Sequence, residues 1–486
     1  MRSNRLVCTL ASVLGLFASN AAHAQCAPSW DTTYDGAGAL QTRSGAALVF
    51  AEFDDDGDGE KSVYAGGSFF LGNSFTGLIR WNGVDWEMVG GGLNSFVNDL
   101  LVFDDDHDGP NPARLFVAGN FLTVDYLTNP RTVRSIATWD GAQFDDVGGS
   151  SDGGQIMDIE LFDPDADGPA NTALYAAGFF TSVGGVSADR IAAWDGVSWT
   201  ALGDGTDLDV LAMQNFDEDG PGPIPSRLWV TGDFVVAGGL TANHIAIWDG
   251  LAWTTVPGGG AAGGGAWPMF LHDPDGDGID SLIVGGSFTG IGGIAAERIA
   301  RYDQGTWSEV GGGLAVDAPG GGNLAFPYAF ATFDADGPGP LAAQLIVGGR
   351  FDSAGGVPLL NIAAWDGANW SALAGGLDGY VRDLYVLDSG ATGNAPTLLA
   401  AGYFEPFAQF PARSLMPAWI GCATPPPSCP ADVDSDGDID LSDLGVVLAN
   451  FGLTGQGPDD GDTDGDGDVD LSDLGVVLAN FGVPCE

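Results

Sequence analysis

The chain has 486 residues, of which 66 are acidic and 15 basic, so its formal net charge is −51 and Lys61 is its single lysine. So strong a negative charge excludes nucleic acid and anionic lipid surfaces as partners, because both carry the same sign. Since 45% of the residues are apolar, we expect folded cores rather than a disordered acidic chain.

Residues 1–24 have the pattern of a secretory signal peptide. Arg2 and Arg5 precede an apolar stretch from Leu6 to Phe17, and Ala22-His23-Ala24 stands before Gln25. No later segment is apolar and long enough to span a bilayer. The sequence therefore predicts an exported protein, extracellular or on the cell surface, in which disulfides can form.

The rest of the chain is dominated by a repeat, seen most clearly from Leu161 to Leu202. An aromatic residue followed by Asp-Gly, or by a degenerate form of it, recurs at intervals of 58, 55, 54, 54, 63 and 54 residues. These corners begin at Trp81, Trp139, Trp194, Trp248, Tyr302, Trp365 and Trp419. A long period held over most of a chain indicates a repeat architecture.

Each unit contains four short apolar runs separated by Gly, Asp and Pro. In the second unit these runs are Val97–Phe103, Leu115–Phe121, Ser135–Trp139 and Phe144–Val147. Four strands in a unit of this length are typical of a propeller blade. The units resemble the W-D-G repeats of kelch-type propellers and of fungal cortical polarity-marker proteins, which implies a mainly β, seven-bladed propeller over residues 25–422.

Asp195-Gly196 is expected to form a two-residue hairpin turn, with Trp194 opposite Val197 and Ala192 opposite Trp199. Trp194 and Trp199 would then be diagonal neighbours on one face. We expect such aromatic pairs to pack blade against blade; the alternative is that they stack on a ligand.

The two ends of this region complement each other. Each complete corner has two aromatic residues, as Trp194 and Trp199 show. Trp419 occupies the first of these positions and Trp30 the second, so strands from both ends of the region should complete the seventh blade. Cys26 and Cys422 lie where the missing turn would be, which predicts a Cys26–Cys422 disulfide and leaves Cys429 to pair with Cys485. Four cysteines allow three such pairings.

Acidic loops separate the first and second strands of most units. Four of them have the spacing D-x-D-x-D-G, in which alternate carboxylates precede a glycine turn, as Ca²⁺ requires. Their candidate ligands are Asp54, Asp56 and Asp58; Asp104, Asp106 and Asp108; Asp163, Asp165 and Asp167; and Asp273, Asp275 and Asp277. Their placement resembles the calcium loops of integrin-type propellers. The alternative is a set of solvated turns capped by aspartate.

A Pro-rich linker, residues 423–429, leads to two near-identical copies offset by 30 residues. The expected calcium ligands are Asp432, Asp434, Asp436, Asp438, Asp440 and Asp443 in the first copy, and Asp462, Asp464, Asp466, Asp468, Asp470 and Asp473 in the second. Helical spacing follows each loop.

Residues 430–486 resemble a type I dockerin, which implies a small calcium-folded helical domain that binds a cohesin-like protein partner. Dockerins read their partner with a residue pair at loop positions ten and eleven, which maps here to Leu441 and Ser442 and to Leu471 and Ser472. A polar pair is usual there, and residues 430–486 contain no Lys or Arg.

No catalytic constellation stands out. His107, His244 and His272 occupy different units at non-equivalent positions, and Asp303-Gln304-Gly305-Thr306-Trp307 is one residue short of the Asp box of sialidase-type propellers. We therefore expect an exported, non-catalytic, calcium-binding propeller tethered through its C-terminal module. The alternative is a glycan-binding or glycan-cleaving propeller, which exposed aromatic residues outside the repeat positions would favour.

Overall fold

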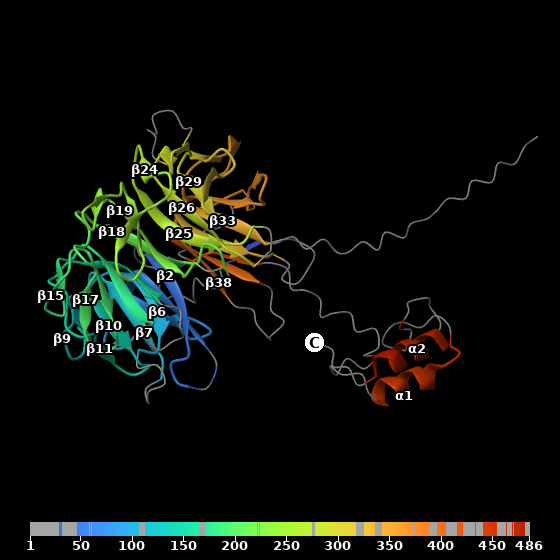
Figure 1. Ribbon diagram of the computed structural model, residues 1–486. Coiled ribbons are helices and arrows are strands. Elements are labelled where there is room, and N and C mark those ends of the chain that lie inside the picture. Colours follow the sequence, from blue (N-terminus) through green and yellow to red (C-terminus); the bar gives the residue numbers. More distant parts are fainter. Residues whose placement is uncertain are drawn as a thin grey trace, which may run out of the picture.

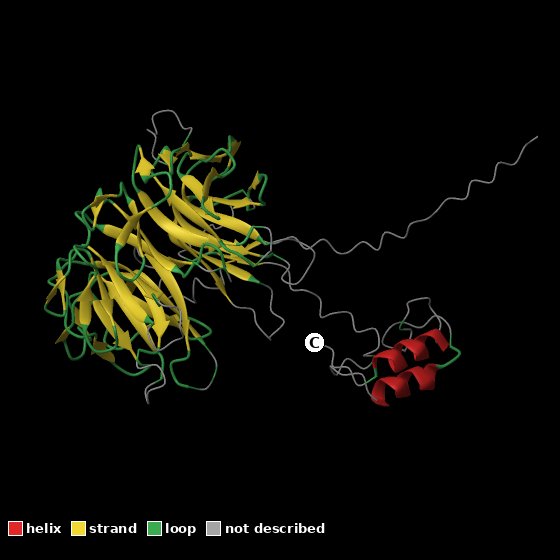
Figure 2. Cartoon of the chain, viewed as in Figure 1, coloured by secondary structure: helices red, strands yellow, loops and turns green. Residues whose placement is uncertain are grey.

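The computed structural model describes residues 29–31, 46–57, 59, 61–105, 112–164, 172–220, 222, 224–274, 278–316, 325–335, 343–373, 375–387, 396–404, 416–420, 433, 441–453, 463, 469 and 471–481. The predicted signal peptide, the linker and the cysteines Cys26, Cys422, Cys429 and Cys485 lie outside these ranges. Within them the chain is mainly β, with two helices, α1 (Leu441–Asn450) and α2 (Leu471–Asn480) (Figure 2).

Most strands belong to seven four-stranded antiparallel sheets in the described part of the chain. The first three are β2 (Ala46–Phe53), β3 (Ser62–Leu71), β4 (Ser74–Trp81) and β5 (Trp86–Met88); β6 (Val97–Phe103), β7 (Arg114–Gly119), β10 (Ile136–Trp139) and β11 (Phe144–Asp146); and β12 (Ile156–Phe162), β13 (Ala173–Gly178), β16 (Ile191–Trp194) and β17 (Trp199–Ala201). The next three are β18 (Val210–Phe216), β19 (Arg227–Gly232), β22 (Ile245–Trp248) and β23 (Trp253–Thr255); β25 (Ala266–His272), β26 (Ser281–Gly286), β29 (Ile299–Asp303) and β30 (Thr306–Glu309); and β32 (Phe326–Phe333), β33 (Gln344–Arg350), β36 (Ile362–Trp365) and β37 (Trp370–Ser371).

The seventh sheet joins the two ends of the repeat region. It consists of β38 (Gly379–Leu387), β39 (Thr397–Phe404), β40 (Ala418–Ile420) and β1 (Ser29–Asp31), and Trp30 pairs directly with Trp419. The predicted pairing of the N-terminal and C-terminal strands in one sheet is therefore confirmed.

Short ribbons lie beside several of these sheets. They are β8 (Thr123–Val124) with β9 (Arg131–Thr132); β14 (Ser182–Val183) with β15 (Val186–Ser187); β20 (Val236–Ala237) with β21 (Leu240–Thr241); β24 (Ala261–Ala262), β27 (Gly290–Ile291) and β28 (Ile294–Ala295); and β31 (Leu314–Ala315), β34 (Ser353–Ala354) and β35 (Val357–Pro358).

The first strands of consecutive sheets touch one another in chain order. β2 contacts β6, the contacts continue through β12, β18, β25, β32 and β38, and β38 in turn contacts β2, which closes the circuit (Figure 1). Apolar cores lie between neighbouring sheets; one of them combines Phe116 and Ile136 of one sheet with Ile159 and Trp194 of the next. Each sheet therefore depends on its neighbours for burial.

The turn at the W-D-G corner differs from the prediction. Trp194 pairs directly with Trp199, so the loop has four residues rather than two, and the expected diagonal register is wrong. Asp195 explains the difference, because its Oδ1 accepts the backbone N–H groups of Val197 at 2.9 Å and Ser198 at 2.7 Å. These bonds stabilise the longer turn and lower the pKa of the Asp195 carboxyl.

The corner aromatics pack between sheets, as expected. The Trp194 and Trp199 rings are 5.5 Å apart, both side chains are buried, and the Trp199 indole donates a hydrogen bond of 2.9 Å to the Val147 carbonyl of the preceding sheet. Trp253 donates in the same way to Leu202. These bonds satisfy buried indole N–H groups at the two sheet boundaries concerned.

Candidate functional site

Aromatic and arginine side chains gather where the first strands of three consecutive sheets begin. The residues come from β25, from β32 and its partner β33, and from β38. They are Trp267, Phe326, Tyr328, Arg350, Tyr380 and Arg382, which we call the aromatic–arginine strip. β25 contacts β32 and β32 contacts β38, so the strip crosses two sheet boundaries (Figure 1).

The rings of the strip follow one another at close range. The centroids of Trp267 and Phe326 are 5.2 Å apart, and those of Phe326 and Tyr328 are 6.1 Å apart with only 15° between the planes. The Arg382 guanidinium lies 4.4 Å from the Tyr328 centroid, and that of Arg350 lies 5.1 Å from the Tyr380 centroid. All six residues keep accessible surface, and Tyr380 is 42% exposed. The arrangement offers flat apolar faces beside positive charge.

Sequence reasoning missed this strip, although a signal for it exists. In each of the three sheets, one residue of the strip comes directly after the first buried residue of the sheet's first strand, at the point where the pairing register shifts. These residues are Trp267, Tyr328 and Arg382. The matching residues in the other sheets are Leu48, Asn98, Met157 and Leu211. An alignment of the first strands alone would have shown aromatic residues outside the W-D-G corner.

A second group lies on β6, β12 and β38 and consists of the half-buried carboxyls Asp99, Asp158, Glu160 and Asp383. Asp99 Oδ2 accepts the Ile159 N–H of the next sheet at 2.8 Å, and Asp158 accepts that of Met213. Asp383 accepts a backbone hydrogen bond from Phe50 in the same way. Three of these acids therefore connect the first strands of neighbouring sheets.

Burial is the main cause of the unusual acidity of these carboxyls. It raises the pKa of Asp99 to about 6, of Asp383 to about 7 and of Glu160 to about 8, and the nearby Asp99 charge adds to the last two shifts. The pKa of Asp158 is raised as well, by burial and then by Asp99. Since three of the four acids hold a neighbouring strand, the group has a structural role.

The acidic loops are described only in part. Asp54, Asp56, Asp104, Asp163 and Asp273 lie within the described ranges, whereas Asp58, Asp106, Asp108, Asp165, Asp167, Asp275 and Asp277 lie outside them. The first aspartate of a loop accepts a hydrogen bond from the backbone N–H of the loop's final glycine. Asp54 accepts from Gly59 at 3.0 Å, and Asp273 accepts from Gly278 at 2.9 Å. This geometry fits both a calcium loop and a capped turn.

The second residue of these loops has a different role from the predicted ligands. Asp105 forms two hydrogen bonds of 2.6 and 2.7 Å with Arg114 at the start of the following strand, and Asp55 and Glu218 pair likewise with Arg80 and Arg227. These side chains hold the loop against its own sheet, so calcium binding would fall to the alternate residues.

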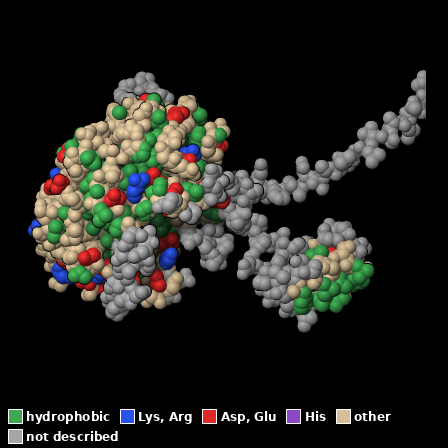
Figure 3. Space-filling model, in the orientation of Figure 1, with side chains coloured by type: hydrophobic (Ala, Val, Ile, Leu, Met, Phe, Trp, Pro, Cys, Tyr) green, Lys and Arg blue, Asp and Glu red, His purple; other side chains and the backbone are tan. Residues whose placement is uncertain are grey.

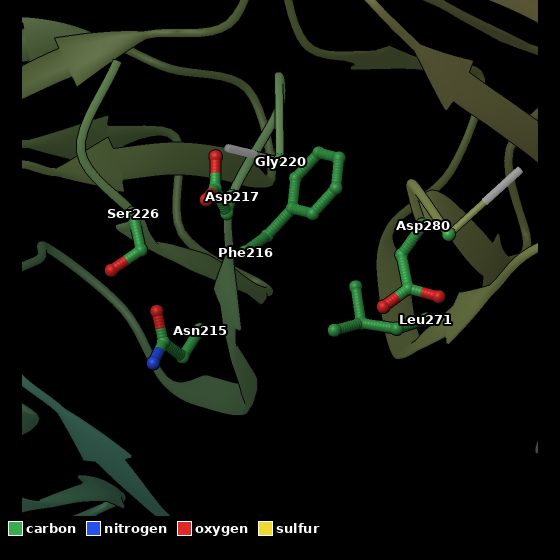
Figure 4. A pocket seen from close by; sticks show the side chains of 8 residues that line it. Asn215, Phe216, Asp217, Gly220, Ser226, Leu271 and Asp280 are labelled. Carbon is green, nitrogen blue, oxygen red and sulfur yellow. The ribbon is translucent and has the colours of Figure 1, made fainter. Parts of the chain in front are cut away.

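A pocket of about 300 Å³ separates two of the acidic loops (Figure 4). Asn215, Asp217 and Ser226 lie on one side of it, and Leu271 and Asp280 on the other. Burial and the Asp273 charge raise the pKa of Asp280. The described residues contain no group of three metal-binding side chains, and the central part of the 273 loop lies outside them.

In the C-terminal module the structure describes the last predicted ligand of each loop. Asp443 and Asp473 are fully buried, and each accepts a backbone N–H from the start of its own loop, Val433 at 2.6 Å and Thr463 at 2.7 Å. Asp432, Asp434, Asp436, Asp438, Asp440, Asp462, Asp464, Asp466, Asp468 and Asp470 lie outside the described residues.

The two helices of this module pack on each other through a small core of Val433, Val447, Val469 and Val477. Other apolar side chains at equivalent positions of the two copies remain exposed: Leu448 and Leu478 at 55% each, Phe451 at 45% and Phe481 at 43%. Leu471, one of the predicted partner residues, is 73% exposed, and Ser472 is exposed too. Figure 3 shows apolar side chains gathered on one face of the helical pair.

No helix in the described ranges is long and apolar enough to cross a membrane. No family model and no curated protein sequence matches the chain. Among solved structures, it is similar to a crystal structure of BBS1N in complex with ARL6DN, soaked with lead, at 11% identity and a TM-score of 0.43, covering 81% of this chain and 96% of that one. It is also similar to the V. cholerae biofilm matrix protein Bap1, at 13% identity and a TM-score of 0.15, covering 81% and 68%.

Proposed function

We propose that the chain is an exported, non-catalytic interaction protein: a seven-bladed, calcium-binding β-propeller tethered to a cohesin-like protein through a C-terminal dockerin-like module. The closed circuit of first strands and the shared seventh sheet support the propeller. The half-buried carboxyls support a non-catalytic body, because three of them accept hydrogen bonds that join neighbouring strands.

The observation that carries the proposal is the exposed apolar face of the helical module. Leu448, Leu478, Phe451 and Phe481 repeat with the internal symmetry of the two copies and are not used by the valine core. Exposed apolar patches of this kind mark protein interaction sites. Leu441 and Ser442, with Leu471 and Ser472, stand at the starts of the same helices and complete the proposed partner surface.

Calcium would fold this module and strengthen the propeller loops. Its four buried valines make a core too small to be stable alone, so metal binding has to supply most of the folding free energy.

The test is binding of the full chain to immobilised cohesin modules of several types, in calcium and in chelator. We expect calcium-dependent capture by at least one type and its loss in a Leu448→Asp, Leu478→Asp double variant. The matched control is Leu251→Asp, which alters a leucine that is 90% exposed on the β body. Equal capture of both variants would contradict the assigned surface.

A second candidate function, glycan binding by the propeller, is favoured by the aromatic–arginine strip. Its rings stand outside the corner positions, are partly exposed and lie in sequence across three sheets. Flat aromatic faces stack on the apolar faces of sugar rings. Most of the described corner aromatics, by contrast, are buried between sheets; these include Trp139, Trp194, Trp248 and Tyr302. A glycan array probed with the full chain, with Tyr380→Ala as the comparison, tests this function.

A further inference from the structure

The arginines of the strip differ from most others in the described part of the chain. Arg80, Arg114, Arg131, Arg190, Arg227, Arg298 and Arg301 each form an ion pair with an aspartate or glutamate. Arg350 and Arg382 have no described carboxylate within salt-bridge distance, although the chain carries 66 acidic residues. Both instead lie over tyrosine rings.

That arrangement prepares the two guanidinium groups for an anion. A ring face holds a guanidinium by a cation–π interaction but accepts none of its N–H bonds, so the donors stay available. Arg114 shows the contrast, because it lies 5.9 Å from the Phe116 ring centroid while its Nη2 donates to both carboxylate oxygens of Asp105 and its Nη1 to the Thr138 hydroxyl. Planar guanidinium groups pair best with carboxylates and other flat oxyanions.

We infer that the aromatic–arginine strip binds a carboxylated polysaccharide, in which sugar rings stack on Trp267, Phe326 and Tyr328 while uronate carboxylates pair with Arg350 and Arg382. This deepens the second candidate function, glycan binding, and rests on it. A uronate chain carries at most one charge per sugar ring, so the net charge of −51 repels it less than it repels double-stranded DNA, whose charges are about 1.7 Å apart along the axis.

The strip extends over three neighbouring sheets. Three aromatic rings follow one another across β25 and β32, Arg382 of β38 lies over the third of them, and Arg350 of β33 lies over Tyr380. Because the residues come from rigid strands of adjacent sheets rather than from long loops, the positions of rings and charges are set before the ligand arrives, which lowers the entropic cost of binding.

The experiment measures the affinity of the full chain for short galacturonate oligomers by calorimetry, with carboxyl-reduced oligomers of the same length as the neutral probe. We expect the uronate form to bind, and Arg350→Gln and Arg382→Gln each to weaken it by about tenfold, because each removes one charge-assisted pairing with a carboxylate. Arg134→Gln, which removes an exposed arginine without a described carboxylate partner, should leave the affinity unchanged. The lysine variants Arg350→Lys and Arg382→Lys control for misfolding. Because they keep the positive charge, they should bind the uronate oligomer more tightly than the glutamine variants do.

Equal affinity for the neutral and uronate oligomers, unaffected by the glutamine variants, would overturn the carboxylate assignment while leaving glycan binding intact. Binding of polyglutamate or oligothymidylate in place of both oligomers would overturn this inference and the glycan-binding function together. Uronate binding that falls equally in the Arg134→Gln variant would show a general charge effect and would also overturn the assignment.

Discussion

Gly148→Ala should destabilise the β body through a single point of packing between neighbouring sheets. Gly148 has a φ of +59°, and a Cβ built there would lie 2.0 Å from Cζ3 of Trp194. Trp194 is buried in the core between two sheets, so its ring cannot move aside without disturbing that core. The substitution therefore adds overpacking to backbone strain.

The cost can be separated into its two parts with a matched glycine. A left-handed backbone costs a non-glycine residue roughly 1–2 kcal/mol, and overpacking a core costs roughly 1–3 kcal/mol. Gly148→Ala should therefore cost about 2–5 kcal/mol, the sum of both parts. Gly185→Ala has a similar φ of +78° but meets nothing within 4 Å, so only the backbone part applies.

The assay is urea unfolding in calcium, followed by circular dichroism. Trp194→Ala alone should cost roughly 3–5 kcal/mol as a large core truncation. In that background the indole is gone, so the further cost of Gly148→Ala should fall to that of Gly185→Ala. If the losses of unfolding free energy from Gly148→Ala and Trp194→Ala were strictly additive, the packing account would be refuted. A Trp194→Ala variant with unchanged stability but abolished ligand binding would show instead that the corner aromatic is a binding residue.

Three further predictions concern charge, metal and disulfides. Because the pKa values of the half-buried carboxyls are raised, their stabilising contribution is complete below about pH 4 and is lost as the pH rises through 6 to 8. Urea midpoints measured in chelator should therefore fall as the pH rises through that window, and they should fall less in Asp99→Asn than in the exposed control Asp204→Asn. An identical pH dependence of the midpoint in the two variants would contradict the assignment. By circular dichroism, isolated residues 423–486 should be unfolded in chelator and gain helix when calcium is added. Asp432→Ala and Asp462→Ala should each remove one calcium site. A helical spectrum in chelator would mean that the loops are ordinary turns. Peptide mapping without reduction should find Cys26 linked to Cys422 and Cys429 to Cys485; a Cys422–Cys429 link would rule out the proposed ring closure.

The repeat made much of the fold predictable from sequence. The strands expected at Val97–Phe103 and Phe144–Val147 begin where predicted and end within a residue of it. The completion of one sheet by strands from both ends followed from counting corners, although the direct pairing of Trp30 with Trp419 did not. The corner turn was not predictable in this way, because Asp-Gly also suits a two-residue hairpin. The carboxylate of Asp195 decides between the turns through two hydrogen bonds that the dipeptide alone does not reveal.

The candidate site was far less predictable. Phe326 and Trp267 are distant in the chain and meet only because neighbouring first strands align their register shifts. The availability of Arg350 and Arg382 depends on which acids lie nearby in space, and no residue spacing encodes that. Asp99 and Asp158 belong to no motif of the sequence, yet each joins its strand to the next sheet by accepting a backbone N–H group.

The central claim is that this chain binds and tethers without catalysing a reaction. The most direct measurement incubates the full chain with a glycan panel in calcium and determines both the bound glycan and the reducing ends released. The account predicts retention of carboxylated glycans with no release above a protein-free blank. Release of reducing ends that Glu160→Gln or Asp158→Asn abolishes would contradict it and would make the half-buried carboxyls catalytic.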